Sequence, residues 1–379
     1  MERRDRVKRI LFLTGTRADF GKLKPLISAV DASHDFDYLI AITGMHLSER
    51  YGNTQVEIEK ARFTKRTTFA NSDPRQRMDV VLANTIAGLA PVVNDYRPDL
   101  LVVHGDRIEA LAGAIAGALN NVRVAHIEGG EFSGTIDESL RHAITKLSHL
   151  HFVANQSASQ IVQQLGEDSS TIFIIGSPEI DIMLSPDLPS IDSVKQHYEV
   201  PFAEYAILLF HSVTTEKERL ANDIAEVVES AKRSGDQFVV IYPNNDAGSD
   251  VIFREYEGLV NNRSFRLIPS MRFEAFQTLL KNANYILGNS SSGVREAPVH
   301  GTPSINVGSR QSGRASDTLI INVPPDVKSI SQAIANSATM KRIPTLSFGD
   351  GKAAERFLEA LRSTVLWQSP LQKRFHRNC

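Results

Sequence analysis

Three carboxylic acids follow two short apolar runs in the first half of the chain, and their spacing suggests proton-transfer chemistry. Asp106 follows the apolar residues 100–103, and Glu128 and Asp137 follow the apolar residues 122–127. Any one of these acids alone is best explained as a solvated surface charge. Three of them close together, beside arginine side chains, favour general acid–base catalysis, in which one group removes a proton and another delivers one.

The second half of the chain contains a motif typical of an anion site. In GNSSSGVRE, residues 288–296, two glycines and three serines lead into a predicted helix at 294–300. Free backbone N–H groups, hydroxyls and the positive end of a helix dipole suit a diphosphate. An ordinary strand-to-helix turn is the alternative, but such a turn needs only one capping serine. If the diphosphate prediction holds, Glu296 can accept hydrogen bonds from ribose hydroxyls; otherwise it is a surface charge.

Arginines near the ends of predicted strands provide positive charge for the same anion. A single loop arginine is usually just solvated, but several directed at one site neutralise a diphosphate without a metal, because a guanidinium binds phosphate in a bidentate manner. These residues are Arg17, Arg107, Arg295 and Arg310. Neither an HExxH pattern nor a GxSxG pattern occurs, so we expect no metal, no other cofactor and no serine nucleophile. His104 and His211 also follow predicted strands, where a histidine is as often structural as functional.

A strand–helix–strand unit must position the three acids. Between the two apolar runs, apolar residues recur at helical spacing from 108 to 119. Such a crossover connects parallel strands and is right-handed nearly always, so both strands end at the same edge of the sheet. Parallel α/β sheets bind ligands beyond the carboxyl ends of their strands. We therefore expect the acids to lie at the site of chemistry.

Composition narrows the class of protein. The 379 residues carry a net charge of −2, with 42% apolar and 23% charged side chains, which is typical of a soluble globular protein with two domains. This charge argues against a nucleic-acid surface, and no apolar run reaches the ~18 residues of a membrane helix. The basic start MERRDRVKR is followed by too short an apolar run for a signal peptide. Cys379 is the only cysteine, so we expect a cytoplasmic protein without intrachain disulfides.

The alternation of strands and helices occurs twice along the chain. We predict an N-terminal Rossmann-like domain at 1–184 with the carboxylates, its sheet of about six strands, and a proline-containing linker at 185–203. A C-terminal Rossmann-like domain at 204–350 follows, and a helix and tail at 351–379 are expected to pack back across the joint. The predicted fold class is therefore α/β, with two doubly wound domains facing a cleft.

Several segments closely resemble the hydrolysing UDP-N-acetylglucosamine 2-epimerases of bacterial sialic acid pathways, and the epimerase half of the bifunctional animal enzyme. They are LFLTGTRADFGKLKPL, HGDRIEALAGA, HIEGGEFSGTIDESLRH, GNSSSGVREAP and GSRQSGR, the last standing where GTRQ is usual. Their order and spacing match over nearly the whole chain. The related non-hydrolysing enzymes carry HGDT and a Glu–Glu pair where this chain has HGDR and Asp137–Glu138, which favours the hydrolysing branch.

The resemblance implies a GT-B fold, UDP bound mainly by the second domain, and a homodimer or homotetramer. It implies catalytic roles for Asp106, Glu128, Asp137 and His211. The UDP contacts that it implies are Arg17, Arg107, Asn244, Met271 through its backbone, Ser290, Ser291, Glu296 and Arg310.

The implied reaction converts UDP-N-acetylglucosamine and water to N-acetylmannosamine and UDP, the first step of sialic acid synthesis. The sugar C2–H is not acidic until UDP begins to leave C1, so elimination to 2-acetamidoglucal is expected before hydration. One alternative is the same reaction on UDP-2,4-diacetamido-2,4,6-trideoxyglucose for legionaminic acid synthesis. A GT-B glycosyltransferase and a non-enzymatic nucleotide-sugar sensor are the others, and a sensor has no use for three carboxylates.

Overall fold

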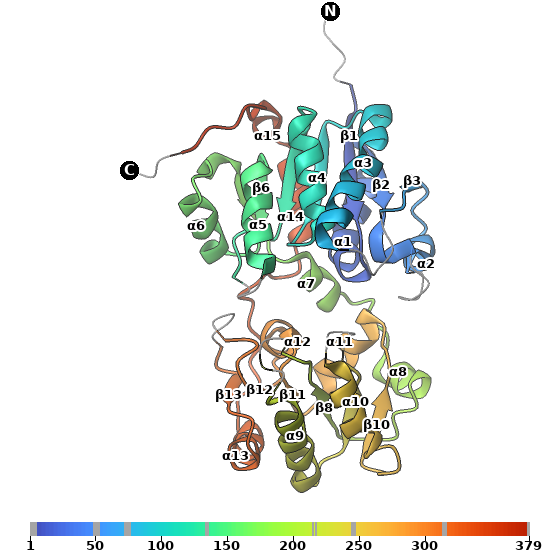
Figure 1. The fold of residues 1–379 in the computed structure, drawn as a ribbon, viewed down its shortest axis with the longest axis vertical. Coiled ribbons are helices and arrows are strands. Elements are labelled where there is room, and N and C mark those ends of the chain that lie inside the picture. The colour runs from blue at the N-terminus through green and yellow to red at the C-terminus, as the bar shows by residue number, and fades with distance from the viewer. Residues whose placement is uncertain are drawn as a thin grey trace, which may run out of the picture. The chain divides into compact units, whose positions relative to one another are not determined.

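The computed structural model describes residues 6–47, 54–71, 77–132, 136–213, 216, 218–243, 248–312 and 317–376. The chain forms two compact units, unit 1 with residues 1–184 and 348–379, and unit 2 with residues 185–347. Each unit contains one parallel sheet with helices on both faces (Figure 1). The predicted α/β class with two doubly wound sheets is confirmed. Within the described residues, no helix is both long and apolar enough to cross a membrane.

The sheet of unit 1 has the strand order β3-β2-β1-β4-β5-β6-β7. Its strands are β1 (Lys8–Thr14), β2 (Phe36–Ile42), β3 (Arg66–Thr68), β4 (Leu100–His104), β5 (Arg123–Ile127), β6 (Leu150–Val153) and β7 (Ile172–Ile174). The order reverses between β1 and β4, and ligands of doubly wound sheets bind at the carboxyl edge near such a reversal.

Helices cover both faces of this sheet, so its strands are apolar on both sides. The helices of unit 1 are α1 (Arg17–Ser33), α2 (Gln55–Lys60), α3 (Met78–Tyr96), α4 (Ile108–Leu119), α5 (Ile136–Leu147), α6 (Gln156–Gln164), α7 (Pro178–Met183), α14 (Ala353–Arg362) and α15 (Thr364–Gln368), with the 3-10 turns η1 (Gly44–Leu47) and η3 (Ser169–Thr171). In β1, Ile10 and Phe12 face the core under α1 and α14. Leu11 and Leu13 face the opposite core, under α3, α4 and α5.

The C-terminal segment is an integral part of unit 1. The ring of Phe357 in α14 lies 6.5 Å from that of Phe12 and 4.8 Å from that of Phe152. Asp181 caps α14 by accepting hydrogen bonds from the backbone N–H groups of Ala353 and Ala354, at 2.9 and 2.7 Å. The last helices therefore complete the hydrophobic core of this unit.

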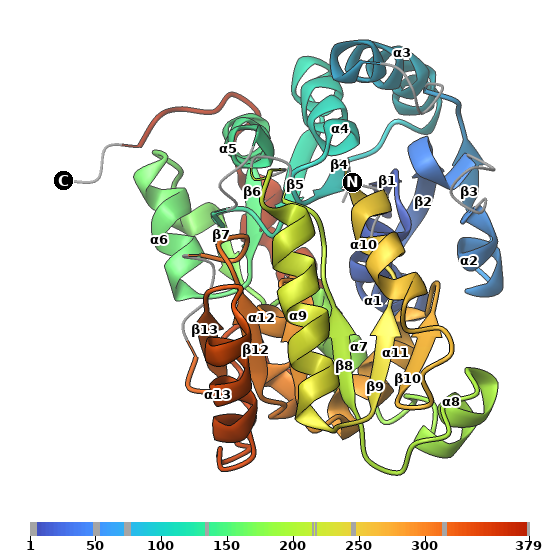
Figure 2. The same cartoon turned by 60° about the horizontal axis from the view of Figure 1, so that its bottom comes forward.

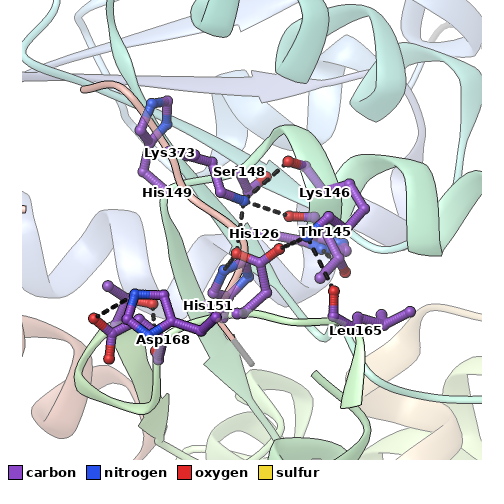
Figure 3. A network of polar contacts seen from close by, with 12 residues as sticks. His126, Thr145, Lys146, Ser148, His149, His151, Leu165, Asp168 and Lys373 are labelled. Atoms are coloured by element: carbon purple, nitrogen blue, oxygen red, sulfur yellow. Dashed lines mark hydrogen bonds and ion pairs between the residues drawn. The ribbon is translucent and has the colours of Figure 1, made fainter. Parts of the chain in front are cut away.

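The tail that follows α15 is anchored on a buried carboxylate. Glu167 pairs with Lys146 Nζ at 2.6 Å, Lys373 Nζ at 2.7 Å and His151 Nε2 at 3.1 Å. Burial acts to raise the pKa of Glu167, but the hydrogen bonds and charges of His151 and the two lysines lower it to about 2. Figure 3 shows Lys373 beside Lys146 and Thr145, whose carbonyl oxygens also accept its hydrogen bonds. The contacts lie near the amino ends of the strands.

The sheet of unit 2 repeats this topology, with the order β10-β9-β8-β11-β12-β13. Its strands are β8 (Ala206–Leu209), β9 (Phe238–Ile241), β10 (Phe265–Ile268), β11 (Ile286–Gly288), β12 (Ser304–Val307) and β13 (Ile320–Val323). Its helices are α8 (Ile191–His197), α9 (Leu220–Ser234), α10 (Ser249–Glu257), α11 (Phe273–Asn282), α12 (Ser291–Arg295), η4 (Pro298–His300) and α13 (Val327–Ser337). Figure 2 shows α9, α10 and α13 side by side on one face, and α8 and α11 pack on the other.

Three local features differ from the sequence prediction. The segment predicted as a linker at 185–203 contains α8, because Val194 and Phe202 fill the core between α11 and the sheet. Two short edge strands, β3 and β13, were not predicted. The helix predicted at 294–300 is instead α12 followed by η4, because Pro298 lacks the N–H group that would continue the α-helix.

Candidate active site

The carboxyl edge of unit 1 brings two of the predicted acids onto neighbouring strands. β4 pairs with β5 so that His104 lies opposite Ile127, and Asp106 and Glu128 follow these two residues. His126 Nε2 lies 2.7 Å from the carbonyl oxygen of Gly105, which ties the turn before Asp106 to β5. The structure thus places the two acids at adjacent strand ends, as the crossover argument predicts.

Glu128 lies in a cage of hydrogen-bond donors. Its Oε2 accepts from Lys22 Nζ at 2.8 Å and contacts His104 Nε2 at 2.9 Å, while Ser177 Oγ donates to its Oε1. Lys22 is also 3.0 Å from a carboxylate oxygen of Glu179. The side chain of Glu128 is 5% exposed, and its φ of 60° lies in the left-handed region. These donors favour the ionised form of Glu128 and fix its orientation.

Asp106 and Asp137 are related through Arg141. Arg141 forms an ion pair with Asp106, and its Nη1 donates to the carbonyl oxygen of Glu131 at 2.8 Å. Asp137 lies in the first turn of α5, four residues before Arg141, so both project from the same side of the helix. Asp137 is exposed. The three acids therefore differ in their surroundings: Glu128 is buried among donors, Asp106 is paired with an arginine, and Asp137 is exposed.

The two arginines predicted in unit 1 also lie at this edge. Arg17 is the first residue of α1, directly after a turn that Thr16 and Asp19 fix by a reciprocal capping box. Arg107 is exposed, with its Nε 3.6 Å from Oε2 of Glu109. Gly15 of the turn allows this arrangement, because a Cβ there would lie 2.7 Å from Cγ of Glu109. Both guanidinium groups thus follow strands at the reversal point of the sheet.

In unit 2, the corresponding edge lies where β8 and β11 end. The backbone N–H of His211 donates to Asn289 Oδ1 at 2.7 Å, and Asn289 Nδ2 donates back to the carbonyl oxygen of His211 at 2.8 Å. Gly288 has a φ of 142°, and a Cβ there would lie 2.0 Å from the carbonyl oxygen of Leu209. Burial, with a smaller effect of the Arg310 charge, lowers the pKa of the His211 imidazole to about 3. His211 is therefore neutral at physiological pH.

The serine-rich turn follows this pair directly. Ser290 caps α12 by accepting a hydrogen bond from the N–H of Ser292 at 3.3 Å, and Ser291 is the first helical residue. Glu296 accepts a hydrogen bond from Ser292 Oγ at 3.1 Å. Arg310 Nη1 donates to the carbonyl oxygen of Asn289 at 3.1 Å. The structure thus gathers hydroxyls, a carboxylate and a guanidinium around one helix start.

Two predicted nucleotide contacts remain. Met271 precedes α11 and packs half-buried against the core that includes α8 and α11. Asn244 lies outside the described residues.

The comparison with known protein families identifies the family of the chain. The model of the family described as UDP-N-acetylglucosamine 2-epimerase matches residues 28–362. The chain belongs to the UDP-N-acetylglucosamine 2-epimerase family. The resemblance stated from the sequence motifs is confirmed at the level of this family.

Three relatives of this epimerase-family chain match most of its length. It is 43% identical to the UDP-N-acetylglucosamine 2-epimerase of Neisseria meningitidis serogroup B, over 97% of this chain and 99% of that protein. It is 33% identical to the UDP-N,N'-diacetylbacillosamine 2-epimerase (hydrolyzing) of Legionella pneumophila, with the same coverage of 97% and 99%. It is 31% identical to polysialic acid biosynthesis protein P7 of Escherichia coli, over 89% and 88% of the two chains.

Solved structures agree on the fold. The UDP-GlcNAc 2-epimerase of Methanocaldococcus jannaschii, solved in complex with UDP-GlcNAc and UDP, superposes with a TM-score of 0.80. The match covers 93% of this chain and 99% of that chain at 22% identity. The likeness therefore confirms the GT-B-like fold class of the epimerase family.

Four residues at the edge of unit 1 were not predicted from the sequence. They are Lys22, Arg141, Ser177 and Glu179. Arg141 had a usable signal, since it follows Asp137 by four residues on a predicted helix. Lys22, Ser177 and Glu179 had none, because they reach Glu128 only through tertiary packing. Among the described residues, no group of three or more His, Cys, Asp or Glu side chains could hold a metal ion.

Proposed function

We propose that this chain is a hydrolysing 2-epimerase that converts UDP-N-acetylglucosamine and water to N-acetylmannosamine and UDP, the first step of sialic acid synthesis. The observation that carries the proposal is the set of three acids with different surroundings at the carboxyl edge of unit 1. Further support comes from the 43% identical Neisseria epimerase and from a relative named for polysialic acid biosynthesis. The hydrolysing form is supported by the name of the Legionella relative.

The proposed reaction has two steps, elimination and hydration. First, the C1–O bond to UDP breaks, a carboxylate takes the C2 proton, and the C2–H electron pair forms the C1–C2 double bond of 2-acetamidoglucal. Second, water adds: its oxygen bonds to C1 and its released proton goes to a carboxylate, while an acid delivers a proton to the opposite face of C2. Removal and delivery need at least two groups, which we assign among Asp106, Glu128 and Asp137.

The remaining predicted residues act on the leaving nucleotide in this proposal. Arg17, Arg107 and Arg310 neutralise charge that develops on the diphosphate, and the hydroxyls and N–H groups of Ser290 and Ser291 donate to its oxygens. We assign Glu296 to the ribose hydroxyls, and Asn244, Met271 and neutral His211 to contacts with the nucleotide-sugar. The described members of this set lie at the carboxyl edges of the two sheets, which supports these assignments.

Turnover in D₂O tests the reaction. If C2–H is removed and a solvent proton returned, N-acetylmannosamine formed from UDP-N-acetylglucosamine in D₂O carries deuterium at C2, and UDP appears in equal amount. NMR measures both. Product with protium at C2, or product that keeps the gluco configuration, contradicts the proposal. Transfer of the sugar to an acceptor with C2–H untouched would instead indicate a glycosyltransferase.

A second substrate has a specific observation in its favour. The Legionella relative is named for UDP-N,N'-diacetylbacillosamine, the diacetamido trideoxy sugar of legionaminic acid synthesis, and is 33% identical. The higher identity to the Neisseria enzyme favours UDP-N-acetylglucosamine. Comparing kcat/KM for the two UDP-sugars decides between them. On the resemblance we also propose a cytoplasmic homodimer or homotetramer, which sedimentation equilibrium can test.

A further inference from the structure

A chain of hydrogen-bonded side chains lies behind the serine-rich turn of unit 2. His300, the last residue of η4, has its Nε2 2.9 Å from Oε1 of Gln277 in α11. Gln277 Nε2 donates in turn to Oε2 of Glu296, at the end of α12. Three separate elements thus meet at the carboxylate that we assign to the ribose.

The chemistry of these side chains determines which group donates in each hydrogen bond. An ionised carboxylate can only accept, so the amide of Gln277 must turn its NH₂ group to Glu296 and its oxygen to His300. His300 must then carry a proton on Nε2. Burial, with a smaller effect of the Lys281 charge, lowers the pKa of His300 to about 4. The imidazole is therefore neutral at physiological pH, and its one proton lies on the nitrogen that faces Gln277.

Burial makes this set of hydrogen-bonded side chains rigid. Gln277 is 0% exposed, so water does not compete for its amide group. Ser292 Oγ donates to the other oxygen of Glu296 at 3.1 Å. Because a donor faces each oxygen, the plane of the carboxylate is fixed before any ligand arrives. A fixed carboxylate suits the two neighbouring hydroxyls of a ribose, because binding then costs no ordering of a flexible glutamate side chain.

We propose that Gln277 and His300 are positioning residues that hold Glu296 in the orientation required by the ribose of the nucleotide. The inference rests on the proposed function, in which Glu296 is the ribose ligand. Gln277 and His300 do not touch the nucleotide themselves. Their removal therefore affects only the part of the affinity that comes from the ribose hydroxyls.

A pair of nucleotides isolates the contribution of the ribose hydroxyls to the affinity. UDP and 2′,3′-dideoxy-UDP differ only in the hydroxyls that Glu296 would bind, so the ratio of their Kd values reports the ribose contact within each variant. We expect Gln277→Leu and His300→Phe to raise the Kd of UDP roughly tenfold, as loss of one hydrogen bond to a charged group predicts. The Kd of the dideoxy nucleotide should not change. His300→Gln should retain the wild-type ratio, because its side-chain amide supplies a donor in place of Nε2. Calorimetry measures each Kd.

Kinetics and a double variant complete the test. The KM for the UDP-sugar should rise with kcat little changed, and Gln277→Leu should have no further effect on UDP binding when combined with Glu296→Ala. If a variant binds UDP and the dideoxy nucleotide more weakly by the same factor, or binds both like the wild type, the inference is overturned. The hydrogen-bonded side chains are then structural only, or have no effect on binding. Wild-type protein that turns over the UDP-sugar but binds both nucleotides equally also overturns it, while the proposed reaction stands. Wild-type protein that neither binds UDP nor turns over the UDP-sugar rejects both.

Discussion

Glutamine at position 128 keeps the shape of Glu128 and removes its charge. With its NH₂ group toward Ser177, whose hydroxyl can also accept, the new amide still presents its oxygen to Lys22 and His104, but the negative charge that Lys22 pairs with is lost. Lys22 keeps its 3.0 Å contact with Glu179, which limits the loss. Charged hydrogen bonds contribute about 1.5–3 kcal/mol each, and the Lys22–Glu128 pair is 20% and 5% exposed, so screening is small. We expect the free energy of unfolding to fall by about 2–3 kcal/mol.

This loss should be visible as a lower melting temperature. For a unit of this size, about 1 kcal/mol corresponds to about 2–4 °C, so Glu128→Gln should melt about 4–12 °C below the wild type by differential scanning calorimetry. Asp137→Asn is the matched control. Asp137 is exposed in the first turn of α5, so solvent screens its charge and the melting temperature of Asp137→Asn should change by about 2 °C or less.

Turnover should respond in the same way to both substitutions. Each variant is expected to lose on the order of 10²–10⁴ in kcat, which is the usual contribution of a general acid or base. Calorimetry and steady-state UDP release on the same preparations separate the two effects. Glu128→Gln that melts like the wild type refutes the argument that the cage holds a charge. Either variant with nearly full turnover removes that residue from the proton transfers.

Four other predictions follow from the same structure. Burial lowers the pKa of His126 to about 3, so the folded protein keeps it neutral while this residue of the unfolded chain binds a proton below about pH 6.5; the contribution of His126 to the free energy of unfolding should fall by about 1.4 kcal/mol per pH unit between pH 6.5 and 3, and urea titrations of His126→Gln should show a slope smaller by one proton. Gly288→Ala should lose more than about 3 kcal/mol or fail to fold, as judged by circular dichroism, because its Cβ has no space. A chain that stops before Thr364 should melt several degrees lower in scanning calorimetry, because it lacks the Lys373 anchor. UDP release should survive excess EDTA, and a loss that only Mg²⁺ restores would contradict the arginine-based neutralisation.

The regular elements could be predicted where burial is strong. The sequence marks the helix Met78–Tyr96 and the strand Ser304–Val307 clearly, because the apolar periodicity of the helix is long and the burial of the strand is complete. The strands Arg66–Thr68 and Ile320–Val323 were missed. Each lies at a sheet edge, and their residues are mostly half-buried or exposed. Arg66–Thr68 contains no apolar residue, whereas the apolar run Leu319–Ile321 is a signal for the second strand that the sequence prediction overlooked.

The candidate site also contains some residues that could be predicted from the sequence and others that could not. Asp106 and Glu128 could be predicted because both follow buried strands, and strand ends are visible in the sequence. The donors around Glu128 could not, because Ser177 lies 49 residues away and Lys22 lies 106 residues away along the chain. Nothing local marks such partners. Sequence patterns thus locate the functional edge of a sheet, while the groups that set the charge state there depend on the folded chain.

The position of Phe357 has a consequence for how the protein is synthesised. Unit 2 is inserted between residues 184 and 348 of unit 1, so the N-terminal 184 residues leave the ribosome without the ring that packs against Phe12 and Phe152. Ribosomes add about 5–20 residues per second, and 357 − 184 = 173 residues take about 9–35 s. Throughout that interval α1 can cover its share of this sheet face, but the part that α14 covers in the folded protein stays without its partner. The later-synthesised unit 2 can therefore complete its fold before unit 1 does.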